Sequence, residues 1–245
     1  MTTKAPTYFR KSGEGSIVSY TFSDLIQNQA YTTFYTLIAL DNSASENKLL
    51  SQQAAESQTN NLTVTLTGSG GVVDPPTLQD THNFDLPVNI TQTIEGNAVC
   101  SFGWNHGITF GSGTIIGSDT AGEGYIVASL IMVRDGSETV IGSGKSQTVS
   151  ESGSTTSSNH QTTLLMDCAE TTLHSGDTLR LKIEIYLGLS QIRFANATSY
   201  IIYYPDPLER NAYSRNYGKP TADDEVYSYA QPVGMKINIP FRPIL

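Results

Sequence analysis

The sequence is poor in charge, in cysteine and in long apolar runs, and each shortage excludes a class of protein. Charged residues make up 15% of the 245 residues, against about 25% in a typical soluble domain. No apolar run approaches the roughly 18 residues of a membrane-spanning helix, and the N-terminus lacks the run of about 7–15 apolar residues that a secretory signal needs. We therefore expect a folded chain that is neither a membrane protein nor exported by a signal peptide.

Basic residues are scarcer than acidic ones. The chain has 14 Lys and Arg against 23 Asp and Glu, which gives a formal net charge of −9 at pH 7. A surface of this sign repels polyanions. We therefore expect no nucleic-acid partner.

The two cysteines, Cys100 and Cys168, lie far apart in apolar, strand-like surroundings, which favours buried free thiols over a disulfide. The acidic cluster Asp223–Glu225 lacks the Asp-x-Asp-x-Asp-Gly loop, so a solvated turn is favoured over a calcium site. None of the histidines has a second His or Cys at zinc-site spacing; they are His82, His106, His160 and His174. We expect no metal and no cofactor.

Hydroxyl side chains, 21 Gly and 13 Tyr make up a composition that disfavours helices and suits strands joined by turns. Over Asp177–Leu187 the odd-numbered residues from Leu179 onward are apolar and their neighbours are polar. This alternation is typical of a strand with one buried face. Met235–Phe241 alternates in the same way, and Ile126–Val133 is apolar on both faces, as in a central strand.

The dipeptide Asp135-Gly136 predicts a tight hairpin turn. About ten predicted strands without helical periods indicate an all-β fold, an antiparallel, jelly-roll-like β-sandwich. We interpret residues 1–245 as one domain with an N-terminal arm at 1–15, a Tyr-rich extended insertion at 205–234 and a terminal strand at 235–245. Ser23–Gln29 could form one short connecting helix.

Long loops are predicted for Gly103–Gly124, Gly142–Asn159 and Pro205–Pro232, which are rich in Gly, Ser or Tyr. The second of these begins Gly-Ser-Gly-Lys-Ser, like the end of a phosphate-binding loop. However, Thr139 stands where the leading glycine is required, and no helical period follows. There is also no Gly-x-Ser-x-Gly elbow, and a carboxylate pair for glycoside hydrolysis is left open. We predict no catalytic residue and no enzyme.

The candidate contact residues are mostly aromatic. The tyrosines of the insertion could contact another subunit, pack on their own domain or stack on sugar rings; they are Tyr213, Tyr217, Tyr227 and Tyr229. Phe9 and Arg10, in the N-terminal arm, are further candidates for assembly contacts. Trp104, in a predicted Gly-rich loop, is the candidate glycan contact.

A set of segments follows a characteristic order along most of the chain: Phe34-Tyr35, Leu49–Ser51, Asn83–Thr91, Glu95–Phe102, Gly136–Gly142, His174–Leu181, Ile202–Pro207 and Lys236–Arg242. Together they resemble β-sandwich proteins predicted from the genomes of tailed viruses, both environmental phages and archaeal tailed viruses. Those proteins look like virion structural components. The insertion between Pro207 and Met235 and the Gly103–Gly124 segment depart from that pattern.

The resemblance implies a virion structural protein that is assembled in the host cytoplasm and located in the particle. Because no fibrous repeat or coiled coil is present, we favour a capsid decoration, cementing or other minor capsid protein over a tail component. Expected partners are other virion proteins, such as the major capsid protein, and further copies in a homo-oligomer; a trimer is common for such modules, but no residue requires one. The alternative is a carbohydrate- or receptor-binding module of a viral tail or spike.

Overall fold

The computed structural model describes residues 18–19, 30–40, 46–55, 61–69, 73–110, 121–152, 156–190, 196–205, 213–214, 228–229 and 235–242. Within these ranges all regular structure is β-strand, which confirms the predicted all-β class. The strands are β1 (Val18–Ser19), β2 (Ala30–Leu40), β3 (Glu46–Ser51), β4 (Leu62–Ser69), β5 (Val73–Pro87), β6 (Gln92–Phe110), β7 (Ala121–Arg134), β8 (Ser137–Lys145), β9 (Val149–Ser152), β10 (Thr156–Leu173), β11 (Thr178–Ser190), β12 (Asn196–Tyr203), β13 (Tyr213–Ser214), β14 (Ser228–Tyr229) and β15 (Lys236–Phe241).

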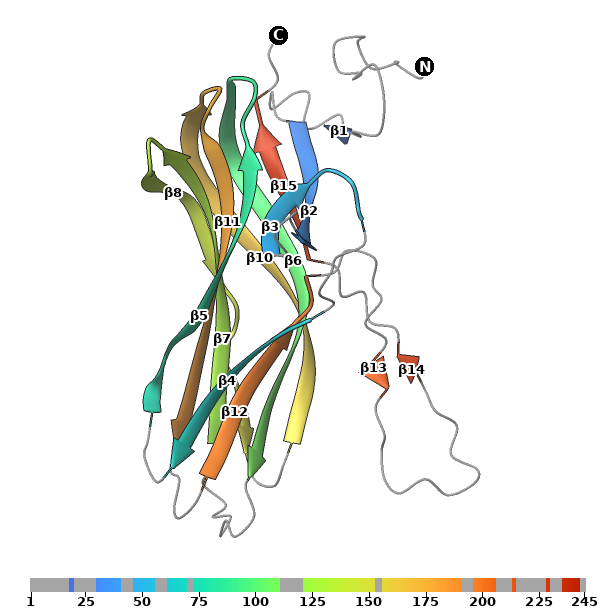
Figure 1. The fold of residues 1–245 in the computed structure, drawn as a ribbon, viewed down its shortest axis with the longest axis vertical. Coiled ribbons are helices and arrows are strands. Elements are labelled where there is room, and N and C mark those ends of the chain that lie inside the picture. The colour runs from blue at the N-terminus through green and yellow to red at the C-terminus, as the bar shows by residue number, and fades with distance from the viewer. Residues whose placement is uncertain are drawn as a thin grey trace.

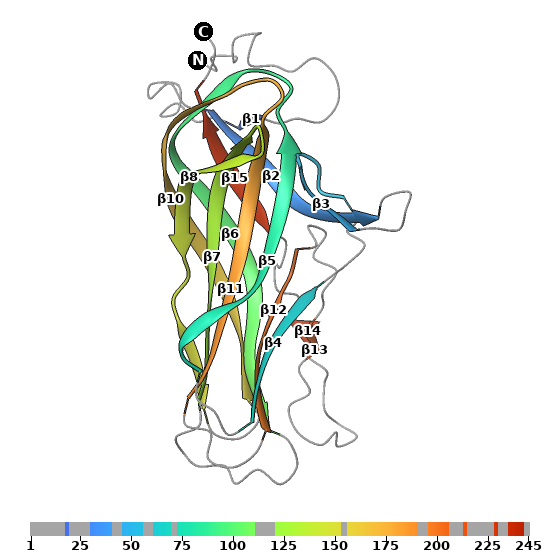
Figure 2. The same ribbon diagram turned by 60° about the vertical axis from the view of Figure 1, so that its left-hand side comes forward.

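Thirteen of these strands form one hydrogen-bonded sheet, and β13 pairs with β14 separately. The large sheet bends back on itself into two layers that share one hydrophobic core (Figures 1 and 2). One layer is built on β6 and β10, and the other on β5, β11 and β7. The layers are linked by β3 and β5, whose pairing at Leu49 and Asp85 is the parallel exception among the described pairs. Among the described residues, no helix is long and apolar enough to cross a membrane.

The long strands divide the sandwich into two halves with different neighbours. Residues 94–101 of β6 pair with β15, whereas residues 104–110 pair with β12. In the other layer, residues 127–134 of β7 pair with β8, and residues 121–124 pair with β9. We call the half with β2, β3, β8 and β15 the upper half, and the half with β4, β9 and β12 the lower half, as they appear in Figure 1.

The core follows the alternation in the sequence. On β11, the apolar residues from Leu179 to Leu187 are fully buried at every second position, which confirms the predicted strand. The tight turn is confirmed as well, because Asp135 and Gly136 both have positive φ angles, 50° and 78°. The terminal strand lies between β2 and β6. Cys100 and Cys168 are buried free thiols, as predicted.

The Gly103–Gly124 loop prediction is wrong over much of its length, because β6 continues to Phe110 and β7 begins at Ala121. In this segment the glycines do not form a turn; they leave room for neighbouring side chains. A Cβ on Gly107 would lie 2.4 Å from the Tyr200 ring, and one on Gly124 would lie 2.9 Å from Ile201 Cδ1. A larger residue at either position would therefore require these neighbouring side chains to move.

The Gly142–Asn159 loop prediction is also wrong, because β8 extends to Lys145 and is followed by β9 and β10. Several other predictions lie outside the described residues: the arm at 1–15 with Phe9 and Arg10, the helix over Ser23–Gln29, and Tyr217 and Tyr227. Tyr213 and Tyr229 are described only through their backbones, which pair with each other.

Candidate functional site

The candidate site lies where the two layers approach each other beside β10. Within the described residues, β10 pairs only with β6, and β8 and β9 pair only with β7. The free edge of β10 therefore lies close to β8 and β9 without a ladder between them. We call this line the β8–β10 seam.

In the upper part of the seam, two glycines of β8 allow this strand to lie in direct contact with β10. A Cβ on Gly142 would lie 2.8 Å from the carbonyl oxygen of Asp167 and 3.0 Å from Cys168 Sγ. A Cβ on Gly144 would lie 3.1 Å from Leu164 Cβ. The glycines of the Gly-Ser-Gly-Lys-Ser motif therefore allow one strand to lie directly on another, which explains the motif without a phosphate.

Ser146 ends this close approach. Its backbone N–H donates to Ile126 O at 2.9 Å, and its hydroxyl accepts from Ile126 N–H at 3.0 Å. The same hydroxyl donates to Gln147 O at 3.1 Å. Ser146 thus stays attached to β7 with both its backbone and its side chain while the following residues turn away from β10.

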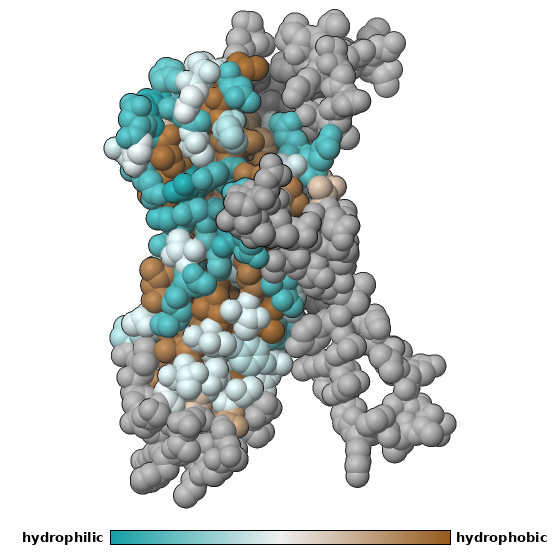
Figure 3. All heavy atoms as spheres, in the orientation of Figure 1, coloured by the Kyte–Doolittle hydropathy of each residue, from teal (hydrophilic) through white to brown (hydrophobic). Residues whose placement is uncertain are grey.

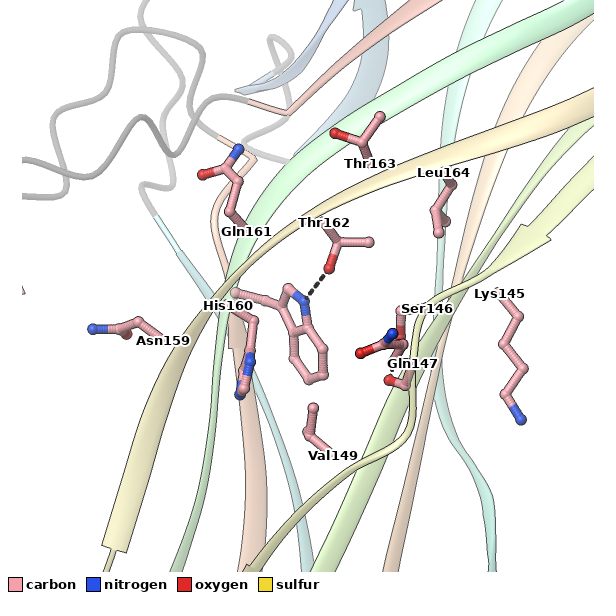
Figure 4. A pocket seen from close by; sticks show the side chains of 11 residues that line it. Lys145, Ser146, Gln147, Val149, Asn159, His160, Gln161, Thr162, Thr163 and Leu164 are labelled. Atoms are coloured by element: carbon pink, nitrogen blue, oxygen red, sulfur yellow. Dashed lines mark hydrogen bonds between the residues drawn. The ribbon is translucent and has the colours of Figure 1, made fainter.

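A cavity of about 470 Å³ opens where the chain turns away (Figure 4). One wall is the bend between β8 and β9, and the other is a run of consecutive residues along β10. Its lining is mostly neutral and polar, with no carboxylate: Trp104, Lys145, Ser146, Gln147, Val149, Asn159, His160, Gln161, Thr162, Thr163 and Leu164. Because side chains from both faces of β10 line the cavity, it lies along the edge of that strand.

A chain of hydrogen bonds closes the lower end of the cavity. The Ser158 hydroxyl contacts the Glu151 carboxylate and lies 2.7 Å from His160 Nε2. A carboxylate only accepts, so the single hydroxyl proton of Ser158 goes to Glu151, and His160 Nε2–H donates to the Ser158 oxygen. In neutral His160 the proton is therefore on Nε2, and Nδ1 is an acceptor. Burial lowers the pKa of His160, although Glu151 opposes that shift.

Trp104 forms the inner wall of the cavity. Its exposed fraction is 1%, and its indole N–H donates to Thr162 Oγ1 at 2.9 Å, the dashed line in Figure 4. The ring centroid lies 4.8 Å from that of His160 at an angle of 38°. Trp104 is thus a strand residue beside a cavity and not part of an exposed loop, and its contact with a glycan stays a prediction.

The lower core also contains a buried histidine, His106 on β6. Its Nε2 lies 3.2 Å from the Ser199 hydroxyl, and its Nδ1 has no partner within the described part of the chain. Burial lowers the pKa of His106 to about 4; the charge of Glu151 opposes this shift, and His160 adds to it. His106 is therefore neutral at pH 7.

A second polar cluster links β3, β5 and β12. Lys48 Nζ donates to His82 Nδ1 at 3.0 Å, and His82 Nε2 lies 3.3 Å from Asp80 Oδ2. The Tyr203 ring packs on His82 with centroids 5.4 Å apart. Burial, followed by the charge of Lys48, lowers the pKa of His82, and burial raises that of Tyr203. This cluster joins the two layers where the sheet crosses between them.

The outer face of β5, β11, β7 and β8 carries cross-strand contacts between polar and aromatic side chains. In the upper half, Arg180 binds Asp85 with two hydrogen bonds of 2.7 and 2.8 Å and Glu138 with one of 2.6 Å. In the lower half, Tyr125 stacks on Tyr186 with centroids 4.6 Å apart. Figure 3 shows hydrophilic side chains gathered over the upper and middle parts of the visible face, with more weakly polar residues below.

Of the candidate contact residues, the structure places Trp104 at the cavity and pairs Tyr213 with Tyr229 through the backbone. Sequence reasoning missed Ser158 and His160, although the Ser-x-His spacing puts both side chains on one face of a strand. A strand assignment for Thr156–Leu173 would have revealed them. Among the described residues, no group of three or more His, Cys, Asp or Glu could hold a metal ion.

No protein-family model matches the chain, and no curated protein matches it. Among solved structures, it is similar to a CocE/NonD family hydrolase from Staphylococcus aureus, with 11% identity over 88% of this chain and 37% of the hydrolase, at a TM-score of 0.42. It is also similar to the structure of the infectious bursal disease virus Gt strain, with 8% identity over 89% of this chain and 48% of that one, at a TM-score of 0.22. The chain spans just over a third of the hydrolase's length. Similarities this low carry no argument about function.

Proposed function

We propose that this chain is a structural protein of a virus particle, a decoration or cementing protein of the capsid that acts through passive protein–protein contacts. The proposal follows the resemblance to virion proteins of tailed viruses. The structural observation that supports it most is how the sheet holds the two ends of the Tyr-rich insertion, residues 205–234.

Both ends of the insertion are attached at the same place on β6. The last residue of β12, Tyr203, pairs with Trp104, and the first residue of β15, Lys236, pairs with Ser101. Between them, Tyr204 N–H donates to Gly103 O at 3.4 Å. The pairing along this edge of β6 therefore passes from one strand to the other across the point where the insertion leaves.

One buried residue holds both ends. The hydroxyl of Thr36, on β2, donates to Pro205 O at 2.8 Å, and Thr36 N–H donates to Met235 O at 3.2 Å. Thr36 is fully buried. An insertion whose ends are fixed at one point can extend toward a neighbouring subunit without disturbing the sheet that carries it, and tyrosines are favoured in such contacts.

The mechanism is the linkage of binding to stability. Each copy that binds the assembled shell and not its dissociated subunits stabilises the shell. Many copies on a lattice allow each contact to be weak. No chemistry is required of the bound protein.

The proposal is tested on purified particles of the virus that encodes the chain. Quantitative mass spectrometry is expected to find the chain in a fixed ratio to the major capsid protein. Treatment that removes the chain is expected to lower the temperature at which the particles release their genome. Particles that lack the chain after gentle purification would contradict the proposal.

A further inference from the structure

We infer that the cavity in the β8–β10 seam binds a neutral saccharide unit. This inference goes beyond the proposed function and does not rest on it, because a particle protein and a protein with another role could both carry such a site. The volume of about 470 Å³ lies within the range of about 300–1,000 Å³ that is usual for small-molecule sites.

The chemistry of the walls favours a neutral, hydroxyl-rich ligand. The Gln147 carboxamide on the bend lies across the cavity from the His160 ring and the Thr162 hydroxyl on β10, whereas Asn159, Gln161 and Thr163 border the cavity with side chains on the other face of that strand (Figure 4). Carboxamides and hydroxyls can both donate and accept hydrogen bonds, as sugar hydroxyls do. The lining therefore matches a ring that presents several hydroxyl groups in different directions.

Charge disfavours ionic ligands. The lining contains no carboxylate that would pair with a cation. Its one permanent cation, Lys145, has its ammonium group 3.6 Å from the centroid of the Tyr125 ring, on the outer face of the sheet. That cation–π contact holds the charge beside the aromatic ring, so the cavity offers little to a carboxylate or phosphate.

His160 adds an acceptor with a fixed orientation. Its Nε2–H donates to Ser158, which in turn donates to Glu151, so Nδ1 is the acceptor nitrogen of the neutral ring. His160 lines the cavity, and its ring is held against Trp104. A sugar hydroxyl can donate to this nitrogen while the carboxamide of Gln147 contacts a neighbouring hydroxyl.

The ends of the cavity argue against an extended peptide as the ligand. A peptide strand added to the free edge of β10 would need an open path along it. Above the cavity, Gly142 and Gly144 leave no space between β8 and β10, and below it the contact of Glu151 with Ser158 joins β9 to β10. The cavity is therefore a bounded site for a small ligand.

The test uses the intrinsic fluorescence of Trp104, which forms the inner wall of the cavity. Trp104 is the only tryptophan of the chain, so its fluorescence reports on this cavity alone. The full-length protein is titrated with glucose, galactose, mannose, N-acetylglucosamine, maltose and lactose, and with galacturonate and inorganic phosphate for comparison. We expect at least one neutral sugar to change the emission saturably, with an affinity about tenfold or more above that of the two anions.

Substitutions locate the binding. Gln147 is exposed, so replacing it with alanine removes a hydrogen-bonding group from the wall at the bend with little effect on the core. Gln147→Ala is expected to bind the sugar about tenfold or more weakly. Gln53→Ala, an exposed carboxamide outside the cavity, is the matched control and is expected to bind normally.

Three results would overturn the inference. They are the absence of a saturable change with every neutral sugar, tighter binding of galacturonate or phosphate, and unchanged affinity in the Gln147→Ala variant. Urea unfolding of each variant confirms that it is folded, so that a lost signal is assigned to the cavity.

Discussion

The upper and lower halves of the sandwich share β5, β6, β7, β10 and β11 but bring their layers together differently. In the upper half, Gly142 and Gly144 let β8 lie on β10, and the seam is closed without hydrogen bonds. In the lower half, the chain turns away at Ser146, and the space is occupied by a cavity and a polar chain that includes His160. The same strand edge is thus covered closely where the neighbouring strand has glycines and borders a cavity where that strand bends away.

The residues that β6 presents to the core also differ between the two halves. Every second residue of β6 faces the core, and in the upper half these residues are apolar, as Cys100 and Phe102 are. In the lower half the same face presents His106, which is fully buried and bonded to Ser199. The core face of β6 thus includes a titratable histidine in the lower half, whereas in the upper half it is apolar.

The largest expected effect comes from opening the sealed part of the seam. Gly142→Val would place a side chain against Asp167 O, a backbone atom that cannot move without shifting β10. We expect a loss of about 3 kcal/mol in the free energy of unfolding, measured by urea titration.

Gly144→Ala is a milder substitution at the same seam, to be compared with Gly142→Val. Its Cβ would meet side-chain atoms of Leu164 and Met166 at 3.1 and 3.4 Å, which can move slightly. We expect a loss of about 1 kcal/mol or less. Equal effects of the two substitutions would show that the backbone contact does not close the seam.

The second-largest expected effect is a pH dependence of the free energy of unfolding, which arises from His106 in the lower half. The pKa of His106 in the folded chain is about 4, against 6.5 in its ordinary state. Between these values the unfolded chain binds a proton that the folded chain excludes, so stability is full above about pH 6.5 and falls as the pH drops toward about 4. From about pH 7.5 to about pH 5 we expect His106 to account for about 2 kcal/mol of lost stability.

His106→Gln removes this titration and keeps a polar side chain beside Ser199. Urea midpoints measured at both pH values are expected to differ less in the variant than in the natural chain. His82 and His160, whose pKa values are also lowered, leave a smaller slope. An unchanged pH dependence would place the titrating group elsewhere.

The third expected effect is a loss of stability on substitution of Thr36, where the two halves meet. Thr36→Val keeps the shape of the side chain but removes the hydroxyl that donates to Pro205 O. We expect a loss of about 1.5 kcal/mol, because a buried carbonyl loses its donor. Thr33→Val, on the same strand, removes a half-buried bond to Asn238 and is expected to cost about 0.5 kcal/mol. Calorimetric unfolding of both variants measures the difference.

The smallest expected loss of stability comes from substitution of Glu138, on the outer face of the upper half. The Lys182 and Arg180 side chains lower the pKa of Glu138 through hydrogen bonds. Because this carboxylate is 37% exposed, Glu138→Gln is expected to cost only about 0.5 kcal/mol, after allowance for screening. The loss is expected to shrink as salt is added, and a salt-independent loss would point to packing.

The local features of the fold could be predicted from the sequence. The strand beginning near Leu179 follows from alternation, and the Asp135-Gly136 turn follows from the preference of these residues for positive φ. The free cysteines follow from their apolar surroundings. In each case the physical cause lies within a few residues of the feature.

Features that depend on distant partners were missed. Gly107 and Gly124 suggested a loop because the side chains that crowd them, Tyr200 and Ile201, lie far away in the sequence. Thr36 looks like any strand threonine until the ends of the insertion are brought to it. The cavity exists because Ser146 turns the chain away from β10, and no local pattern specifies that turn.

The most direct test of the proposed function replaces residues 206–234 with a short Gly-Ser linker. Both ends lie at Thr36, so about four linker residues span the gap, and the sandwich is expected to unfold at an unchanged temperature. Co-sedimentation with particles stripped of the chain then measures binding. The account predicts that the natural chain binds to saturation and that the linker variant, although folded, does not. Equal binding of the two proteins, or none by the natural chain, would contradict it.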